Sequence, residues 1–391
     1  MNRNSVPLSA RRPARPAVPA IARIAVVILV LFVFLLGVKG LGDGFGLLGR
    51  DIIDRFFTVT SNPFIGLIVG LLATTLVQSS SVTTAMIVGL VAAPASPLPL
   101  ANAVPMIMGA NIGTTVTATL VSLGHMGRRE EFERAFPVAI CHDIFNYLAV
   151  LVLLPIELAT GYLRRSAVAL ATLVEGGGGV TYESPIKAAL SAAFTPMTIL
   201  SQWLFRTQTA RAVFLIVVSG VLIVVTLYLL VTLMRAAVHT RVEGIVTNVF
   251  GANPLLAMVA GVVVTIMVQS SSITTSLLVP LAGAGLLKLE QAFPVTLGAN
   301  LGTTVTAFLA ALAVSGPNAA AGLEIALVHL LFNLSGIVLI YPVPAVRARP
   351  LSLARLLTRA AVRSPKVTAL WIGALFYGIP ALVLLVDRWL T

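Results

Sequence analysis

The chain contains one segment twice, and this internal duplication limits its fold more than any other feature. Residues 62–84 align without a gap with residues 253–275, and 11 of the 23 positions are identical. Both copies end in the same polar run, QSSSVTT in the first and QSSSITT in the second. Because copies of a duplicated unit fold alike, the structure is expected to contain two similar halves.

Two further pairs of matching segments follow in the same order. GANIGTTVTA at residues 109–118 matches GANLGTTVTA at residues 298–307 in 9 of 10 positions, and HDIFN at residues 142–146 matches HLLFN at residues 329–333. The offsets between the copies are 191, 189 and 187 residues. Three blocks in one order with nearly constant spacing indicate two homologous halves rather than chance similarity.

The composition places these two halves in a membrane. The chain is 58% hydrophobic and 10% charged, whereas soluble domains average roughly a quarter charged residues. A helix of about 20 apolar residues crosses the hydrocarbon core. We therefore predict an all-α polytopic membrane protein. The clearest predicted spans are residues 23–38, 135–154, 212–234, 325–341 and 367–386.

The net charge of +12 does not indicate a nucleic-acid partner. Cytoplasmic loops of membrane proteins are rich in Lys and Arg, and the basic residues cluster at residues 11–15 and 347–366. No aromatic residues are interleaved with them, as a base-stacking surface would require. The single cysteine, Cys141, excludes an intramolecular disulfide and is expected to pack as a small hydrophobic residue.

Each half predicts a re-entrant hairpin followed by a broken helix. Apolar runs of about 15 residues flank QSSS on both sides, and neither is long enough to span, so QSSS is expected near the tip of a hairpin. In the next element, the Gly and Asn of GANxGTT interrupt a helical pattern, which predicts a helix broken at membrane depth. Unpaired backbone there is tolerated only where it faces protein or a wet cavity.

The number of crossings between the two hairpins predicts how the halves are oriented. We expect three crossings: the broken helix, residues 135–154 and residues 212–234. An odd number turns the second half upside down, which predicts an inverted repeat. With a cytoplasmic N-terminus, the loops on that side hold 17 of the 26 Lys and Arg residues, in support of this orientation. Residues 186–205 are expected to lie on the surface as an amphipathic helix; if they crossed, the halves would be parallel.

These elements divide the chain into seven parts, and the first is expected to be disordered because it is rich in Pro and Arg. The parts are a basic N-terminal tail (1–20), the first transmembrane helix and loop (21–60), repeat 1 (61–158), an inter-repeat connector (159–210), a linking transmembrane helix (211–252), repeat 2 (253–345), and a basic cytoplasmic loop with the last transmembrane helix (346–391).

The duplicated polar motifs lie in segments without formal charge. Residues 56–127, 244–287 and 291–323 contain no Asp, Glu, Lys or Arg. The chain has no HExxH motif, no cluster of carboxylates and no GxxxxGK[ST] loop, and neither QSSS run brings a base beside its serines. We therefore predict that the chain is not an enzyme, needs no cofactor and binds no transition metal.

Uncharged hydroxyls, amides and helix ends can nevertheless bind ions. Helix N-termini carry a partial positive charge and free N–H groups, which bind anions. Helix C-termini and unwound carbonyls, together with Ser, Thr, Asn and Gln oxygens, suit a small hard cation such as Na⁺. The alternative is that these small residues only allow close helix packing. Because the whole constellation occurs twice, we favour a site for an anion or polar solute together with a cation.

Asp143 breaks the duplication, since the equivalent position of the second half is Leu330. A single carboxylate within an apolar helix is expected to be functional. The alternatives are an ion pair or a position near the start of a helix. For His142 and His329 we favour a structural, hydrogen-bonded role over titration, and Glu157 is expected to reach the membrane interface.

The paired QSSS blocks, the paired GANxGT blocks and residues 134–158 resemble the type II sodium-dependent phosphate cotransporters. The resemblance covers residues 20–345. It implies uptake of inorganic phosphate coupled to Na⁺ by alternating access, with Na⁺ as the coupling ion and the lipid bilayer as surroundings. A phosphate exporter or exchanger on the same fold, or an ion channel, is the alternative. The sequence does not set the oligomeric state.

Carried over by position, the resemblance implies one group of phosphate ligands and one group of sodium ligands. It also implies that an Asp at the position of Asp143 gives an electrogenic cycle with an additional Na⁺ bound near it. Pro137 departs from the pattern of charge-moving relatives, which have a small residue there. A short connector without a disulfide fits a bacterial inner-membrane protein. The implied phosphate ligands are Gln78, Ser79, Ser80, Ser81, Gln269, Ser270, Ser271 and Ser272. The implied sodium ligands are Thr83, Thr84, Asn111, Thr114, Thr115, Asp143, Thr274, Thr275, Asn300, Thr303 and Thr304.

Overall fold

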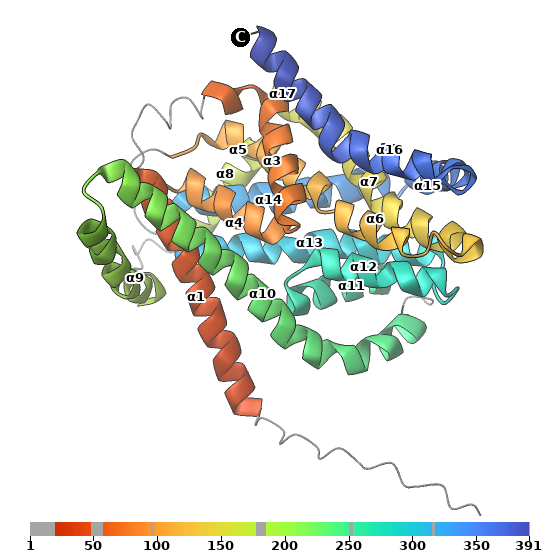
Figure 1. The fold of residues 1–391 in the computed structure, drawn as a ribbon, viewed down its shortest axis with the longest axis horizontal. Helices are drawn as coiled ribbons and strands as arrows, with labels where there is room; N and C mark the ends of the chain where they lie inside the picture. The colour runs from red at the N-terminus through yellow and green to blue at the C-terminus, as the bar shows by residue number, and fades with distance from the viewer. Residues whose placement is uncertain are drawn as a thin grey trace, which may run out of the picture.

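The computed structural model describes six stretches of the chain, and every regular element in them is a helix (Figure 1). The predicted tail lies outside the described residues except for Ala20, which begins the first helix. The described residues are 20–47, 58–94, 97–176, 185–249, 253–314 and 317–390. The helices are α1 (Ala20–Leu47), α3 (Pro63–Val77), α4 (Ser80–Val91), α5 (Leu100–Gly113), α6 (Val116–Leu123), α7 (Arg129–Thr160), α8 (Tyr162–Gly176), α9 (Pro185–Leu204), α10 (Gln208–Val249), α11 (Pro254–Val268), α12 (Ser271–Gly283), α13 (Leu289–Ala313), α14 (Ala319–Ile340), α15 (Pro344–Arg363), α16 (Pro365–Gly373), the π-helical turn η1 (Ala374–Gly378) and α17 (Ile379–Leu390).

Seven helical stretches among the described residues are long and apolar enough to cross a membrane. Each of the five predicted spans overlaps one of them, which confirms a polytopic all-α membrane protein. Helix α9, which covers the segment expected on the surface, is not among the seven. The seven stretches are Ala25–Phe45, Leu100–Leu123, Arg129–Thr160, Gln208–Leu229, Leu289–Ala313, Ala319–Ile340 and Thr368–Val386.

Both QSSS segments form the tip of a helix–turn–helix hairpin, α3–α4 in the first half and α11–α12 in the second. The four helices have 12 to 15 residues, hence roughly 18 to 22 Å at 1.5 Å per residue. This is less than the ~30 Å of a hydrocarbon core, so no single helix of a hairpin can span it.

The two hairpins begin in the same way. The Asn62 Oδ1 atom accepts a hydrogen bond of 3.0 Å from the Phe64 N–H, and the Asn253 Oδ1 atom accepts one of 2.9 Å from the Leu255 N–H. In both hairpins a proline follows the asparagine at the first helical position, where its missing N–H costs nothing. The Asn-Pro pair thus caps each hairpin.

The hairpin tips are also built alike. Gln78 and Gln269 adopt the left-handed conformation, with φ of 57° and 54°, and end the first helix of each hairpin. The next residue caps the second helix: the Ser79 hydroxyl accepts from the Val82 N–H, and the Ser270 hydroxyl accepts from the Ile273 N–H, each at 3.3 Å. A sharp turn of two residues therefore joins the two helices.

The GANxGTT helix is interrupted in the first half, as predicted, but it is continuous in the second half, where the prediction is wrong. In the first half, α5 ends at Gly113 and α6 begins at Val116, with the Thr115 N–H bonded to the Ile112 carbonyl in a tighter turn. In the second half, α13 continues through GANLGTT without interruption. The glycines there serve close packing rather than unwinding.

Glycines let the GANxGTT helix of each half touch its hairpin backbone to backbone. A Cβ atom on Gly109 would collide with the Leu67 carbonyl oxygen, and one on Gly298 would collide with the Met258 carbonyl oxygen. Because small residues permit such close approach in membranes, α5 packs tightly on α3 and α13 packs tightly on α11.

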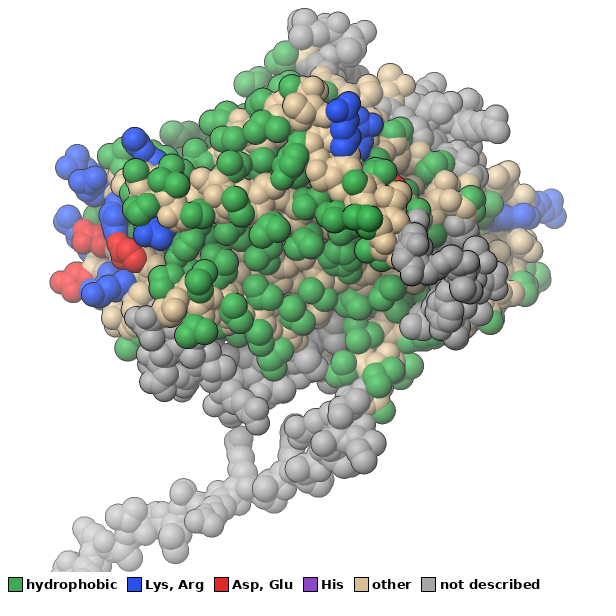
Figure 2. Space-filling view, turned by 180° about the vertical axis from the view of Figure 1, so that it is seen from behind, with side chains coloured by type: hydrophobic (Ala, Val, Ile, Leu, Met, Phe, Trp, Pro, Cys, Tyr) green, Lys and Arg blue, Asp and Glu red, His purple; other side chains and the backbone are tan. Residues whose placement is uncertain are grey.

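The two hairpins lie on either side of the central helix α13 (Figure 1). Helix α13 contacts α4 of the first hairpin and both α11 and α12 of the second. Helices α1 and α10 lie side by side at the outside of this core. A broad hydrophobic surface covers the middle of the molecule. Acidic and basic side chains lie together at one end, and further basic side chains lie at the top and at the opposite end (Figure 2).

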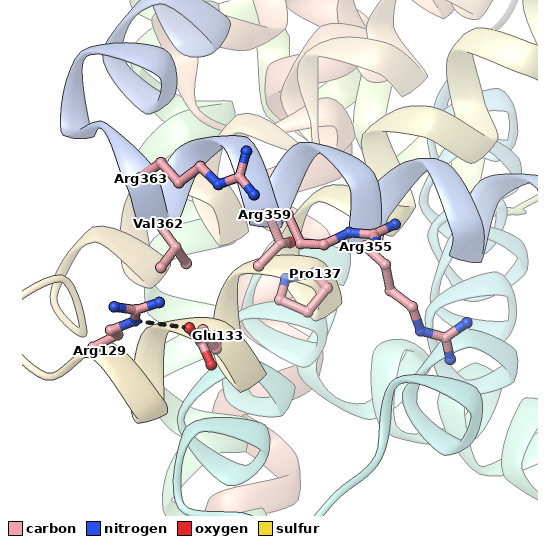
Figure 3. Close-up of a pocket in the computed structure, with 8 residues that line it drawn as sticks. Arg129, Glu133, Pro137, Arg355, Arg359, Val362 and Arg363 are labelled. Carbon is pink, nitrogen blue, oxygen red and sulfur yellow. Dashed lines mark hydrogen bonds and ion pairs between the residues drawn. The ribbon is translucent and has the colours of Figure 1, made fainter.

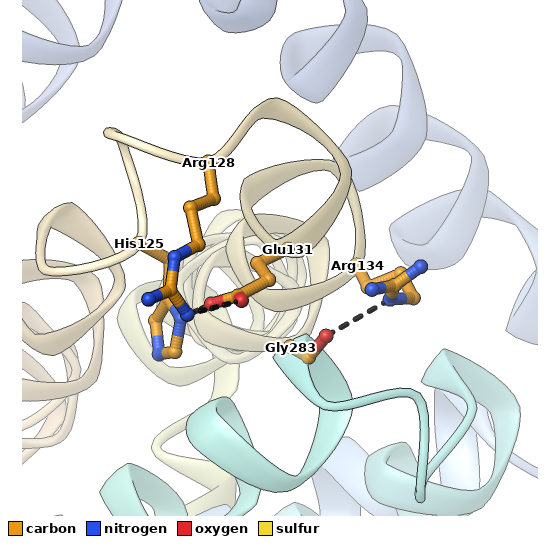
Figure 4. A network of polar contacts seen from close by, with 5 residues as sticks. All are labelled: His125, Arg128, Glu131, Arg134 and Gly283. Carbon is orange, nitrogen blue, oxygen red and sulfur yellow. Dashed lines mark hydrogen bonds and ion pairs between the residues drawn. The ribbon is translucent and has the colours of Figure 1, made fainter.

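The charged end is tied to the second hairpin. The Arg134 Nε atom of α7 donates a hydrogen bond of 2.9 Å to the Gly283 carbonyl at the C-terminus of α12 (Figure 4). A cation is favourable there because a helix C-terminus carries a partial negative charge. In the first turn of α7, the Glu131 carboxylate accepts a hydrogen bond from Arg128 at 2.7 Å and contacts the His125 ring at 3.1 Å.

Candidate substrate and ion site

The two hairpin tips meet in the interior of the molecule. The Ser81 hydroxyl donates to the Gln269 carbonyl at 3.4 Å, which links the first tip to the second. The Ser272 hydroxyl donates to the Thr114 carbonyl at 3.4 Å, which links the second tip to the interruption between α5 and α6. The structure therefore brings the two QSSS runs and one GANxGTT motif into a single place.

Each tip glutamine is held by a threonine of its own half. The Thr117 hydroxyl donates to the Gln78 Oε1 atom at 2.9 Å, and the Thr306 hydroxyl donates to the Gln269 Oε1 atom at 3.0 Å. Sequence reasoning missed both threonines, although they occupy the same place in the GTTVT part of the two motifs. Thr306 also lies 3.4 Å from the Ser81 hydroxyl and so joins both halves.

Most of the residues assigned to the site from the sequence are buried, while the start of each tip is less covered. Gln78 is exposed, and Ser79, Gln269 and Ser270 are half-buried. The buried members are Ser80, Ser81, Thr83, Thr84, Asn111, Thr114, Thr115, Asp143, Ser271, Ser272, Thr274, Thr275, Asn300, Thr303 and Thr304.

Each tip presents both kinds of helix end. The N-termini of α4 and α12 begin at Ser80 and Ser271, and the C-termini of α3 and α11 end beside them at Val77 and Val268. An N-terminus carries partial positive charge, and a C-terminus carries partial negative charge. Each tip can therefore attract an anion at one helix end and a cation at the other.

The threonine hydroxyls of the GTT motifs donate to their own helices. Thr114 and Thr115 donate to the Ala110 and Ile112 carbonyls at 2.9 and 2.8 Å. Thr303 and Thr304 donate to the Ala299 and Leu301 carbonyls at 3.0 and 2.7 Å. Because a hydroxyl has one proton and two lone pairs, these oxygens retain acceptor capacity that suits a cation.

The threonines after QSSS differ between the halves. Thr274 and Thr275 donate to the Ser270 and Ser271 carbonyls at 3.2 and 3.0 Å, and Thr83 donates to the Ser79 carbonyl at 3.3 Å. The Thr84 hydroxyl, which is buried, has no hydrogen-bond partner among the described residues. The first tip therefore holds a buried oxygen that is free to contact an ion.

The two asparagines of the GAN motifs exchange partners between the halves. His142 contacts the Asn300 Oδ1 atom at 2.6 Å, and His329 contacts the Asn111 Oδ1 atom at 3.3 Å, each through Nε2. An amide oxygen only accepts, so the imidazole Nε2–H donates in both pairs. Asn146 adds a further bridge by accepting from the Asn300 Nδ2 atom at 2.9 Å. The histidines are thus hydrogen-bonded, as expected, and hold the two halves together.

Asp143 lies in the middle of α7, fully buried, and has polar contacts from two other helices. Its Oδ2 atom accepts from the Thr119 hydroxyl of α6 at 3.1 Å and from the Trp371 Nε1 atom of α16 at 3.3 Å. Its Oδ1 atom has no hydrogen-bond partner among the described residues. Among the described residues, Asp143 forms no ion pair, and it lies in the middle of α7 rather than near its start, so neither an ion pair nor a helix-start position describes its surroundings there.

Thr119 and Trp371 are contacts that the sequence did not reveal. Thr119 lies one helical turn after Thr115, and in the second half its equivalent is Phe308.

Glu157 was expected at the interface, but it is buried and accepts from the Leu163 N–H at 2.6 Å. It caps α8, where a carboxylate satisfies free N–H groups and the helix dipole.

Comparisons with known proteins give one consistent result. The chain matches the model of the Na⁺/Pi-cotransporter family over residues 33–175 and 222–382. It is 34% identical to sodium-dependent phosphate transport protein 2A of Rattus norvegicus over 418 residues, which cover 90% of this chain and 65% of the relative. It is 30% identical to sodium-dependent phosphate transport protein 2B of Homo sapiens over 438 residues, which cover 90% of this chain and 63% of the relative. The chain therefore spans less than two thirds of these relatives, and no solved structure matches it.

Proposed function

This chain belongs to the Na⁺/Pi-cotransporter family, and on that basis we propose that it is a secondary-active symporter that takes up inorganic phosphate together with Na⁺. It is a transporter and not an enzyme, and it needs no cofactor besides Na⁺ as the coupling ion. The observation that carries the proposal is the meeting of the two QSSS tips. That meeting joins two helix N-termini with a set of buried hydroxyls in segments without formal charge.

Phosphate binds at the N-termini of α4 and α12. Free N–H groups and the serine hydroxyls of the two QSSS runs surround it there. Helix N-termini are established anion sites in proteins. The glutamines, fixed by Thr117 and Thr306, orient their amide groups at the mouth of the site.

Na⁺ binds beside phosphate, at the threonines after QSSS and in the GAN and GTT motifs. No Lys or Arg is available in these segments to balance a divalent anion, so Na⁺ supplies the countercharge. Phosphate bound without Na⁺ would be poorly compensated. We therefore expect ordered binding, with Na⁺ first and phosphate affinity rising steeply with Na⁺ concentration.

Asp143 binds an additional Na⁺ and makes the cycle electrogenic. Its buried carboxylate has one oxygen without a partner among the described residues, and no positive side chain forms an ion pair with it there. A carboxylate at membrane depth is stabilised by a counterion. The bound Na⁺ is that counterion, and its charge crosses the membrane with the substrate.

Transport proceeds by alternating access of two inverted halves. Three of the candidate spans lie between the two hairpins, which is the odd number that inversion requires. The hairpins are too short to span and enter the membrane from opposite sides. We infer a cytoplasmic N-terminus and a location in a bacterial inner membrane.

The test is uptake of radiolabelled phosphate into proteoliposomes that hold the purified full chain. The arms are an inward Na⁺ gradient, choline, Li⁺, and Na⁺ with excess sulfate, with protein-free vesicles as the control. We expect accumulation that requires Na⁺ and that sulfate leaves intact. Equal uptake in choline and Na⁺ would refute the symporter, and flux that does not saturate with phosphate would indicate a channel.

A further inference from the structure

A cleft lined by four arginines lies at the charged end of the molecule, far along the chain from either QSSS tip. Helix α7 provides Arg129 and Glu133, and α15 provides Arg355, Arg359 and Arg363 (Figure 3). The cleft has a volume of about 480 Å³. Pro137 of α7 and Thr358 and Val362 of α15 also line it. We call this the arginine cleft.

The arginine cleft has more positive than negative charge. Arg129 pairs with Glu133 at 3.0 Å, and Arg355 pairs with Glu290. Arg359 and Arg363 form no ion pair in the described part of the chain. Because Arg355, Arg359 and Arg363 are four residues apart, they form one row on the helix. Two uncompensated guanidinium groups therefore face a concave surface that is wide enough for an anionic group.

Helix α15 has a third face besides its buried side and its arginine row. Leu351, Ala354, Thr358 and Ala361 are buried in the protein. Leu353 and Leu356, by contrast, are 40% and 55% exposed. On a helical wheel these two leucines lie next to the arginine row and away from the buried face. An amphipathic helix with exposed leucines beside arginines is typical of the membrane interface.

The position of α15 in the chain supports the same placement. It follows the candidate span Ala319–Ile340 and precedes the candidate span Thr368–Val386. With only three residues before it and one after it, the helix is held at the end of both spans, at the level where lipid headgroups lie. Its exposed leucines can then contact acyl chains while its arginines contact phosphate.

We propose that the arginine cleft binds the phosphate-bearing headgroup of an anionic phospholipid. Arg359 and Arg363 bind the phosphate oxygens through pairs of N–H groups, as guanidinium groups do, and Arg129 contributes charge from the opposite wall. The acyl chains run along Leu353 and Leu356. Basic pockets between transmembrane helices are suited to such headgroups. The exposed leucines favour a lipid over free inorganic phosphate, which has no apolar part.

The experiment measures lipid retention on the full chain, independently of transport. The purified protein in mild detergent is titrated with phosphatidylglycerol or phosphatidylcholine of identical acyl chains, and bound lipid is counted by native mass spectrometry. Inorganic phosphate is added in a separate arm as a competitor. For the unchanged chain we expect one retained phosphatidylglycerol molecule that phosphatidylcholine does not replace and that millimolar inorganic phosphate does not displace.

The key variant is the double substitution Arg359→Gln/Arg363→Gln, and its matched control is Arg164→Gln/Arg165→Gln. The control removes the same charge from two exposed arginines of α8 that do not line the cleft. We expect about tenfold or greater loss of phosphatidylglycerol affinity in the first and less than about twofold loss in the control. Equal losses in both would reduce the effect to general surface charge and overturn the proposal.

Glu133→Gln provides a test that misfolding cannot imitate. Among the described residues that line the cleft, Glu133 is the one acidic side chain. Its removal also frees Arg129, so lipid affinity should increase about threefold or more. An unchanged or weaker affinity would contradict the proposal. Binding of inorganic phosphate that is lost in Arg359→Gln/Arg363→Gln, without any retained lipid, would assign the cleft to free phosphate instead of a headgroup.

Discussion

The two hairpins of this chain have nearly the same backbone, whereas the helices that follow them and their polar contacts differ. Both hairpins begin with a capping Asn-Pro pair and turn at a left-handed glutamine followed by a capping serine. Beyond the tips they diverge: Thr119 and Asp143 of the first half correspond to Phe308 and Leu330 of the second. Duplication thus conserved the scaffold, whereas a charged position exists in one half alone.

The divergence also involves the end of the chain. Trp371 of α16 donates to Asp143, and Leu375 of η1 accepts from Tyr147, which lies one turn further along α7. Both contacts attach the last span to the first half. We expect shared positions to shape the proposed site and unshared positions to tune it, so substitutions at equivalent positions should separate the two roles.

The largest effect is expected from the shared glycines. Gly109→Val and Gly298→Val each force a side chain into a backbone carbonyl, so each should destabilise the fold by more than about 3 kcal/mol. The size-exclusion peak of the folded protein should then disappear. Thermal unfolding followed by size-exclusion chromatography measures this. Gly373→Ala, at a helical position with open space, is the control and should behave as the unchanged chain. A difference between the two halves would show that the close contacts are not equivalent.

The next largest effect concerns the position that the halves do not share. Asp143→Asn keeps the size of the side chain and can still accept from Thr119 and Trp371, so the fold should persist. Because the negative charge is lost, the transport current should disappear and the apparent Na⁺ affinity should fall at least about tenfold. Two-electrode recording and uptake at varied Na⁺ check this. The matched control is Leu330→Asn, and full current in Asp143→Asn would refute the assigned role.

The tip serines should give an intermediate effect that is similar in the two halves. Ser81→Ala and Ser272→Ala each remove one hydroxyl that contacts the other half. Ser81 contacts Gln269 and Thr306, and Ser272 contacts Thr114. A lost hydrogen bond of about 1 to 1.5 kcal/mol predicts a rise of about five- to twelvefold in the phosphate KM. Ser335→Ala, whose hydroxyl contacts Tyr162 on the outside, serves as the control. Unchanged KM values in both tip variants would remove these serines from the phosphate site.

What the sequence predicted well was local. Asn62, Pro63, Gln78 and Ser79 determine where a hairpin begins and turns through contacts within three residues, so a repeated motif predicts a repeated structure.

What the sequence did not predict depends on distant packing. Gly302 permits close approach of α13 to Thr265 and Val262. A glycine can equally mark the point where a helix unwinds. For this reason the prediction that α13 would break was wrong. Trp371 contacts Asp143 across 228 residues of sequence, and no local sequence pattern predicts such a contact. The roles of Gly302 and Trp371 therefore depend on which residues the tertiary structure brings against them.

The smallest effect should separate two equivalent threonines. Thr117→Val and Thr306→Val each remove the donor that holds a tip glutamine, but Thr306 also lies 3.4 Å from Ser81 of the other half. Thr306→Val should therefore raise the phosphate KM about threefold or more, and Thr117→Val should raise it about twofold or less. Uptake kinetics on matched proteoliposomes measure both. A larger rise in KM for Thr117→Val than for Thr306→Val would contradict this. It would mean that the orientation of Gln78 at the exposed first tip matters more for phosphate binding than the contact between Thr306 and Ser81.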